Sequence, residues 1–149
     1  MNKVKIKLLT STAKLPVYAT DGAACFDVYA DRIIKSIHHI SGNDVYQYST
    51  GLSFELPKGK ALMIYSRSGD GIKRHITLSN STGVIDSDYR GELIVQLEKS
   101  IPSVCGFPKA GERICQAMII DAPQYDFEVV DELSETGRGA GGFGSTGRE

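Results

Sequence analysis

Apolar and polar residues alternate along several segments of this chain, and the alternation is the first guide to its fold. Successive side chains of a β-strand point to opposite faces, so a repeat of two indicates a strand with one buried face. Glycine and proline turns separate these segments, and no long stretch has the 3.6-residue spacing of an amphipathic helix. The pattern predicts an all-β fold with at most one short helix, starting near residues 66–69 and running through Ile72 to His75. The alternating positions are Val4, Ile6 and Leu8; Leu52, Phe54 and Leu56; Leu62 and Ile64; Leu93, Val95 and Leu97; and Ile114 and Met118.

The end of the chain breaks this pattern. From Ser134 onward glycine, serine, threonine and arginine dominate. Glycine loses the most backbone freedom on folding and has no side chain to bury, so this segment cannot build a core. We therefore expect a β-domain over residues 1–133 and a flexible arm over residues 134–149, ordered only by a ligand or a partner. Phe143 is the arm's one large apolar residue and its candidate for stacking on a flat group.

Size and charge narrow the possible functions. A chain of 149 residues with 41% hydrophobic residues suits a single core. Its formal net charge of -1 gives no global attraction to polyanions, so we expect neither nucleic-acid nor membrane-surface binding, and any phosphate chemistry must be local.

The compartment is predicted from the cysteines and the apolar runs. Cys25, Cys105 and Cys115 are an odd number without a C-x-x-C pair, which favours a reducing compartment. The first apolar run, residues 6–9, is too short for a signal sequence, and no run approaches the roughly 18 residues of a membrane span. We expect a soluble, cytoplasmic protein.

The densest chemistry lies in residues 83–92, where carboxylates, a phenol and a guanidinium crowd a turn between two apolar runs. Asp86 and Asp88 are two residues apart, so in extended backbone they would point to the same side, where their charges need compensation. This is typical of a binding or catalytic site. The ordinary alternative is an acidic turn with a surface tyrosine.

Two further segments are rich in hydrogen-bond donors. Residues 66–69 combine an arginine fork, two hydroxyls and a glycine, a set that suits phosphate oxygens, although a serine-capped helix with a surface arginine has the same sequence. Residues 139–144 match G-x-G-x-x-G, but the chain ends too soon for the helix that a dinucleotide site requires. The backbone amides there, with Arg138, Ser145 and Thr146, could instead wrap a phosphate chain; the alternative is a disordered terminus.

Single polar residues in apolar surroundings are weaker signals. Gln116 enters an apolar run and needs a hydrogen-bond partner, which neighbouring backbone could supply. Asp27 stands among small and apolar residues and must be paired or metal-linked. The adjacent His38 and His39 would face opposite sides of a strand, and no zinc-ligand spacing occurs. A serine or cysteine nucleophile stays open, although no G-x-S-x-G elbow is present.

Taken together, five segments occur in a familiar order: residues 23–30, 66–69, 83–92, 111–116 and 138–147. In that order the chain resembles the trimeric dUTPase family, with G-V-I-D-S-D-Y-R-G-E and R-G-A-G-G-F-G-S-T-G as its most specific motifs. The resemblance implies a jelly-roll-like β-fold and a homotrimer. It also implies three active sites at subunit interfaces, each built by two subunits and closed by the arm of the third.

The resemblance also assigns roles to residues. It implies that dUTP is hydrolysed to dUMP and pyrophosphate, which supplies dUMP and limits uracil incorporation into DNA. Asp86 is similar to the general base that activates a water toward the α-phosphorus, and Tyr89 to the residue under the deoxyribose that excludes a 2′-hydroxyl. Uracil is read by Asn80 with the backbone of Gly83, Val84, Ile85 and Asp86. The phosphate ligands are Arg67, Ser68, Gly69 and Gln116, and the arm contributes Arg138, Phe143, Gly144, Ser145 and Thr146, with the ring of Phe143 over the base. Mg²⁺ is held chiefly by the phosphates and water, with Asp27 in an outer shell.

Some positions depart from the family pattern. Ser66 stands where proline is usual, and Cys25-Phe26 replaces the common Gly-Tyr. Asp70 replaces the usual leucine, and its negative charge beside the phosphate ligands predicts reduced triphosphate affinity unless the side chain points away.

Two rivals remain. A dCTP deaminase shares the fold and oligomer, but it uses a glutamate at the position that corresponds to Gln96. A nucleotide-controlled regulator that binds another protein would keep the fold, although the intact Asp86 argues against a purely binding role.

Overall fold

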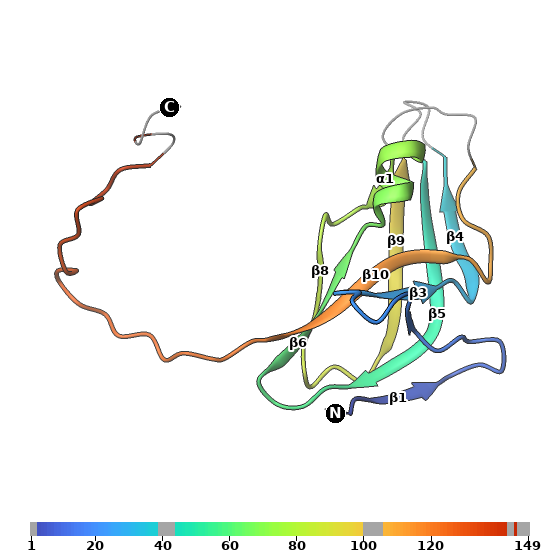
Figure 1. Cartoon of the computed structure of the whole chain (residues 1–149), viewed down its shortest axis with the longest axis horizontal. Helices are drawn as coiled ribbons and strands as arrows, with labels where there is room; N and C mark the ends of the chain where they lie inside the picture. Colours follow the sequence, from blue (N-terminus) through green and yellow to red (C-terminus); the bar gives the residue numbers. More distant parts are fainter. Residues whose placement is uncertain (1–2, 39–43, 100–105, 143–144, 146–149) are drawn as a thin grey trace.

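Two antiparallel β-sheets form the body of the protein (Figure 1). The structure is a computed structural model that describes residues 3–38, 44–99, 106–142 and 145. It confirms the all-β prediction. The elements are β1 (Lys5–Leu8), β2 (Val17–Tyr18), β3 (Phe26–Tyr29), β4 (Arg32–Ile37), β5 (Val45–Glu55), β6 (Lys60–Tyr65), α1 (Ser68–Arg74), β7 (Ile76–Leu78), β8 (Gly83–Ile85), β9 (Glu92–Lys99) and β10 (Arg113–Asp121).

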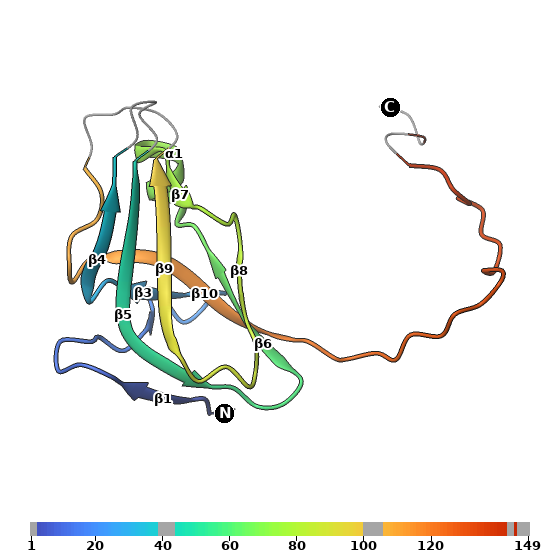
Figure 2. The ribbon, with the colours of Figure 1, turned by 180° about the vertical axis from the view of Figure 1, so that it is seen from behind.

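The core lies between the two sheets. One sheet has the order β1-β5-β9-β7, with β4 also paired to β5, and the other has the order β2-β3-β10-β6-β8 (Figure 2). Leu93, Val95 and Leu97 of β9 are buried while Ile94 and Gln96 are exposed, as the alternation predicted. The core also includes Phe26, so the phenylalanine that departs from the family pattern is a packing residue.

Strands β4 and β10 depart from a regular alternation, and each departure has a physical reason; β4 was not predicted, whereas a strand at β10 was. Strand β4 is exposed along almost its whole length, including Ile33 and Ile34, so it has no buried face to generate a period of two. In β10 the consecutive residues Ile114 and Cys115 are both buried, because the register with β3 shifts between Arg113 and Cys115. Such a bulge moves a side chain to the other face of the strand.

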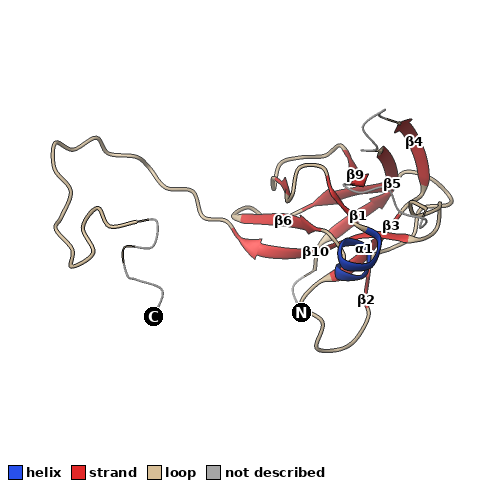
Figure 3. Ribbon diagram, turned by 90° about the horizontal axis from the view of Figure 1, so that it is seen from above, coloured by secondary structure: helices blue, strands red, loops and turns tan. Residues whose placement is uncertain are grey.

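The short helix α1 confirms the helix expected over residues 66–75 (Figure 3). It starts after Arg67, whose backbone is extended and whose side chain makes no capping hydrogen bond, so the alternative of a serine cap is wrong. It ends at His75 in the left-handed conformation, with φ of 55°. In the described part of the chain, no helix has the length and apolar character needed to cross a bilayer.

The sheet ends before the composition changes. Strand β10 finishes at Asp121, and the chain then runs away from the body without strand structure in its described residues (Figures 1 and 2). Its side chains are open to solvent, with Phe127 98% and Val129 99% exposed. The division at residue 134 stays a prediction, but the extended segment begins at Ala122.

Candidate active site

Sheet register brings two of the sequence-predicted polar residues together. Asp27 of β3 lies directly opposite Gln116 of β10, which in turn pairs with Tyr65 of β6. Side chains directly opposite in an antiparallel pair share one face, so Asp27 and Gln116 are neighbours on the same side of the sheet. Phe26 and Val28 on either side of Asp27 point into the core, which leaves Asp27 on the outer face.

Asp27 is paired with two arginines. Arg67 Nε donates to Asp27 Oδ1 at 3.2 Å, and Arg113 Nη1 donates to Oδ2 at 3.1 Å. The Asp27 side chain is 14% exposed, and two cations are what a carboxylate with so little water requires. Of the two alternatives predicted for Asp27, paired or metal-linked, the structure shows pairing, and this pairing joins the segment at residues 23–30 to those at 66–69 and 111–116.

Ser66 is bonded to both β7 and β10. Its hydroxyl accepts a hydrogen bond from the Leu78 backbone N–H at 2.9 Å, which a proline at this position could not do. Its carbonyl accepts from Gln116 Nε2 at 3.0 Å. Gln116 is thus satisfied by neighbouring backbone, and this bond holds the connection between β6 and α1 against β10.

The predicted donors Ser68 and Gly69 form the exposed start of α1, next to Arg67. The first amides of a helix have no acceptor within it, so they are open to a ligand. Arg67, Ser68, Gly69 and Gln116 are therefore close together. We call the hollow of about 280 Å³ beside them the arginine hollow; it is lined by Tyr29, Arg67, Arg74, Gly111, Glu112 and Arg113.

Two residues of this region were missed as site residues. Arg113 pairs with Asp27, and Arg74 donates to Asp70 Oδ1 at 2.9 Å. Asp70 and Arg74 are four residues apart on a helix, a spacing that places an ion pair on one face and could have been read from the sequence. Asp70 does not point away from the phosphate ligands, because its Oδ2 accepts from Arg67 Nη1 at 3.0 Å.

The uracil-reading residues predicted from the resemblance lie at one connection between the two sheets. Strands β7 and β8 are joined by a turn that contains Asn80, whose side-chain amide lies beside Gly83. Gly83, Val84 and Ile85 form β8, which pairs with β6, and Asp86 follows directly. The structure therefore brings Asn80, Gly83, Val84, Ile85 and Asp86 into one neighbourhood.

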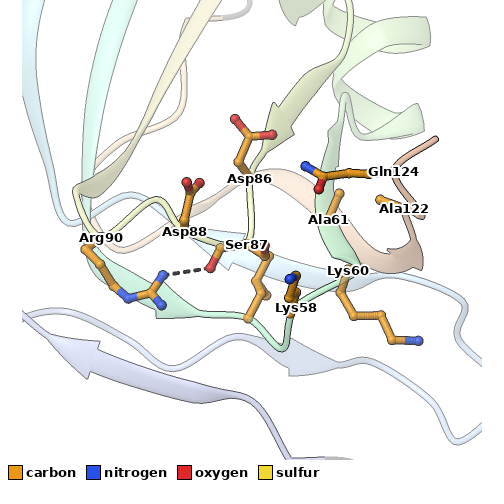
Figure 4. Close-up of a pocket in the computed structure, with 11 residues that line it drawn as sticks. Lys58, Lys60, Ala61, Asp86, Ser87, Asp88, Arg90, Ala122 and Gln124 are labelled. Carbon is orange, nitrogen blue, oxygen red and sulfur yellow. Dashed lines mark hydrogen bonds between the residues drawn. The ribbon is translucent and has the colours of Figure 1, made fainter. Parts of the chain in front are cut away.

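Asp86 and Asp88 lie in a turn, so the reasoning from extended backbone was wrong. The Tyr89 N–H donates to the Asp86 carbonyl at 3.2 Å, and Arg90 braces the turn by donating to the Ser87 carbonyl at 2.7 Å (Figure 4). Asp86 is exposed, and among the described residues its carboxylate accepts no hydrogen bond. It is free to accept one from a water or a ligand.

Tyr89 folds back over the chain. Its hydroxyl donates to the Glu92 carbonyl at 3.2 Å, and its ring lies against Gly91. The side chain is 45% exposed, so it can contact a ligand.

The phosphate donors and Asp86 lie apart within one chain. Asp86 borders a separate opening of about 1020 Å³, which we call the Asp86 cleft; it is lined by Leu56, Lys58, Gly59, Lys60, Ala61, Asp86, Ser87, Asp88, Arg90, Ala122 and Gln124 (Figure 4). Ile85 pairs with Leu62, so Asp86 lies near the start of β6, whereas Arg67 follows its end. At about 3.3 Å per residue, the six residues from Ala61 to Arg67 span at most about 20 Å, so Asp86 and Arg67 lie near opposite ends of β6.

The described part of the arm makes only local hydrogen bonds. Arg138 Nε donates to the Gly141 carbonyl at 2.8 Å, and the Ser145 N–H donates to the Gly142 carbonyl at 3.0 Å. The candidates Phe143, Gly144 and Thr146 lie outside the described residues, as do Cys105 and His39. Arg138 and Ser145 are not brought to either the arginine hollow or the Asp86 cleft in this chain.

The other candidate chemistries find little support in the described residues. Burial raises the pKa of the Cys115 thiol to about 12, with a smaller contribution from Asp27, so it is not a thiolate at neutral pH. His38 pairs with Asp44 at 3.2 Å. Over residues 3–38, 44–99 and 106–142, no three His, Cys, Asp or Glu side chains are grouped as a metal site.

Comparisons with known proteins agree with this geometry. The family model described as dUTPase matches residues 11–147. A relative named deoxyuridine 5′-triphosphate nucleotidohydrolase, from Desulfitobacterium hafniense (strain DSM 10664 / DCB-2), is 41% identical over 99% of both chains. A mutant dUTPase of Staphylococcus bacteriophage 80alpha, solved with dUpNHpp, has a TM-score of 0.81, 22% identity and 99% coverage of both chains. A mutant dUTPase of phage phi11 of S. aureus, solved to describe the coordination of a structural Mg(II) ion, has a TM-score of 0.76 and 18% identity, over 89% of this chain and 99% of that one.

Proposed function

The chain belongs to the dUTPase family and hydrolyses dUTP to dUMP, and we propose that it does so at sites shared between three copies of the chain, with Asp86 as the general base. Pyrophosphate is the second product. The observation that carries this proposal is that Asp86 and Arg67 lie at opposite ends of β6.

That separation requires more than one subunit. A general base must lie within about 3 Å of the proton that it removes, so Asp86 must stand next to the attacked α-phosphorus. The phosphate donors must touch the same triphosphate, which Arg67 of the same chain is too far away to do. In a symmetric oligomer, the Asp86 cleft of one subunit faces the arginine hollow of the next.

The extended segment between β10 and the arm supports the same assembly. Tyr125, Phe127 and Val129 are 75%, 98% and 99% exposed, and they repeat with a period of two. A row of large apolar side chains in water is unfavourable, so this segment gains stability by packing on a neighbouring copy. We propose that Arg138, Phe143, Gly144, Ser145 and Thr146 then close a site of the trimer, with the arginine and hydroxyls on the phosphates and the phenylalanine ring on the base.

Specificity comes from the β7–β8 connection with β8 itself, and from Tyr89. Asn80 and the backbone of Gly83, Val84, Ile85 and Asp86 read the uracil edge and leave no room for a thymine methyl. Tyr89 lies against Gly91 and is exposed on its other face, where it packs under the deoxyribose and excludes a 2′-hydroxyl. A rigid pocket wall rejects the wrong nucleotide because the extra group clashes with it, rather than because a favourable contact is lost.

The proposed reaction at the phosphorus is a displacement by water. The exposed Asp86 carboxylate accepts a proton from a water while the oxygen of that water bonds to the α-phosphorus. The bond between the α-phosphorus and the oxygen that bridges it to the β-phosphate breaks, and pyrophosphate leaves. Arg67, Ser68, Gly69 and Gln116 of a neighbouring subunit hold the phosphate oxygens, and their charge and N–H groups stabilise the negative charge that moves onto the leaving group.

Mg²⁺ fits this site only through water and the substrate. Both oxygens of Asp27 already accept a guanidinium hydrogen bond, yet a carboxylate oxygen has a second lone pair for a metal-bound water. Asp27 would therefore contact the ion in its outer shell, while the phosphates hold it. The ion would neutralise phosphate charge and orient the chain of phosphates.

The remaining rivals are separated by specific observations. Gln96 is exposed on β9 and carries an amide where the deaminase chemistry needs a carboxylate. A regulatory protein partner stays a hypothesis, and it is compatible with hydrolysis because a nucleotide-ordered arm would provide a switch.

The test is a comparison of dUTP, dTTP, UTP and dCTP as substrates with Mg²⁺. We expect pyrophosphate release chiefly from dUTP, and a loss of about 10²- to 10⁴-fold in kcat for Asp86→Asn, as expected for a missing general base. A chain truncated before Arg138 should bind the substrate weakly. Ammonia from dCTP would assign the chain to the deaminases, and an active Asp86→Asn variant would remove the proposed base.

A further inference from the structure

Asp70 is a buried carboxylate shared by two guanidinium groups. It is 4% exposed, and its two oxygens accept from Arg67 Nη1 at 3.0 Å and from Arg74 Nη1 at 2.9 Å. A carboxylate without water is stable only when it is paired, and charge-assisted bonds to arginine are strong and directional. Asp70 therefore fixes the position of both arginines.

Arg67 is consequently held at two atoms of its guanidinium. Asp27 binds its Nε and Asp70 binds its Nη1, so the plane of the group is set by two elements, β3 and α1. An arginine has five N–H groups, and three stay available, one on Nη1 and two on Nη2. A donor set that is fixed before the ligand arrives loses less conformational freedom on binding.

Arg74 offsets the charge that Asp70 adds. Four ion pairs connect three guanidinium groups with two carboxylates in one cluster. The guanidinium groups belong to Arg67, Arg74 and Arg113, and the carboxylates to Asp27 and Asp70. This cluster has a net charge of +1, and without Arg74 it would be neutral. Arg74 is held in place because its Nη2 also donates to the Gly106 carbonyl.

We propose that Asp70 and Arg74 are a coupled positioning pair for Arg67, in which Asp70 orients the phosphate-binding guanidinium and Arg74 cancels the repulsion that Asp70 would exert on a triphosphate. The inference rests on the proposed function of Arg67 as a phosphate ligand. It replaces the expectation that Asp70 simply weakens binding, because that expectation assumed an uncompensated charge.

The test is a double-variant cycle with dUpNHpp and dUMP as probes, measured by calorimetry with Mg²⁺. Arg74→Ala leaves Asp70 uncompensated, so we expect about tenfold weaker dUpNHpp binding, within the usual range for coupled charges, and a smaller change for dUMP. Asp70→Asn in the Arg74→Ala background should recover most of that loss, so the double variant binds dUpNHpp more tightly than Arg74→Ala alone. Arg74→Lys keeps the charge and should stay close to the original chain.

A purely structural pair would give a different result. In that case both single variants would lower the melting temperature, the double variant would be at least as weak a binder as Arg74→Ala, and dUpNHpp and dUMP would be affected alike. Any of these binding results overturns the inference. If Arg74→Ala does not fold, the single variants Arg74→Lys and Asp70→Asn decide whether Arg74 compensates the charge of Asp70. Charge compensation is excluded if Arg74→Lys weakens dUpNHpp binding as much as Asp70→Asn does.

Two controls separate this inference from the proposed function. Glu55→Gln removes an ion pair with Lys5 that is far from the arginine hollow, and it should leave dUpNHpp binding unchanged. Arg67→Ala should weaken dUpNHpp binding strongly. If Arg67→Ala binds dUpNHpp normally, the proposed role of Arg67 is wrong. If Arg67→Ala binds weakly but Asp70→Asn does not restore binding in the Arg74→Ala background, only the coupled pair is wrong.

Discussion

At the scale of single residues, Gly91 determines where Tyr89 lies. A Cβ atom at position 91 would lie 2.5 Å from Tyr89 Cζ, well inside van der Waals contact, and the atoms that would clash belong to a rigid ring. The ring is also tied back by its bond to the Glu92 carbonyl. The proposed exclusion of a 2′-hydroxyl therefore depends on a residue that itself touches no substrate.

Gly91→Ala should push the Tyr89 ring out of this position. We expect the ratio of kcat/KM for dUTP to that for UTP to fall roughly 10-fold, the effect of a contact worth about 1 to 3 kcal/mol. Gly22→Ala is the matched control, because nothing lies within 4 Å of its added methyl group. An unchanged ratio in Gly91→Ala would contradict the role given to Tyr89.

At the scale of elements, an irregularity in β5 anchors the segment that carries Asp86 and Tyr89. The β5–β9 register shifts between Ser49 and Ser53, and Gly51 adopts φ of 66° there. Glu92 accepts from the Gly51 N–H at 2.7 Å and from the Ser49 hydroxyl, and Ser53 donates to the Arg90 carbonyl at 2.7 Å. These bonds fix the turn after β8 onto the buried strand.

Gly51→Ala should destabilise the fold through this irregularity. The new methyl would lie 2.6 Å from Ala13 Cβ and 2.8 Å from Thr10 Oγ1, in addition to the strain of a positive φ. Gly59→Ala is the control, because Gly59 has φ of 77° and open space around it, so it tests backbone strain alone. In urea unfolding, we expect Gly51→Ala to lose about 1 to 3 kcal/mol more than Gly59→Ala, the usual cost of overpacking. Equal losses would mean that the contact relaxes freely.

At the scale of the whole molecule, the distance between Asp86 and Arg67 predicts complementation between inactive subunits. Asp86→Asn and Arg67→Ala should each be nearly inactive as pure proteins. In trimers that contain both variants, a site can combine Asp86 from one subunit with Arg67 from another, and this restores roughly one of the three sites.

Co-expression of the two variants with different affinity tags provides the measurement. Trimers that carry both tags are isolated, and their dUTP hydrolysis is compared with that of each variant alone. Two copies of the same variant that carry the two tags serve as the control for tagging. No recovery in the mixed trimers would show that each site is built within one subunit.

Much of the site was predictable because it is local in sequence. The donor set at residues 66–69, the short helix after it and the turn that contains Asp86 are contiguous segments, which local composition and spacing can indicate. Residues joined across strands were harder. Asp27 was predicted to be paired, but its partners Arg67 and Arg113 depend on the alignment of β3 with β10, which no local pattern gives.

By itself the sequence determined that the fold is all-β with one short helix near residues 66–75, and which side chains can handle phosphates, because these follow from residue spacing and from the chemistry of each side chain. Only the tertiary structure decided that Asp70 binds Arg67, and that Asp86 and Arg67 stand at opposite ends of β6. The physical reason is register, since which residues meet across a sheet is set by core packing over the whole chain.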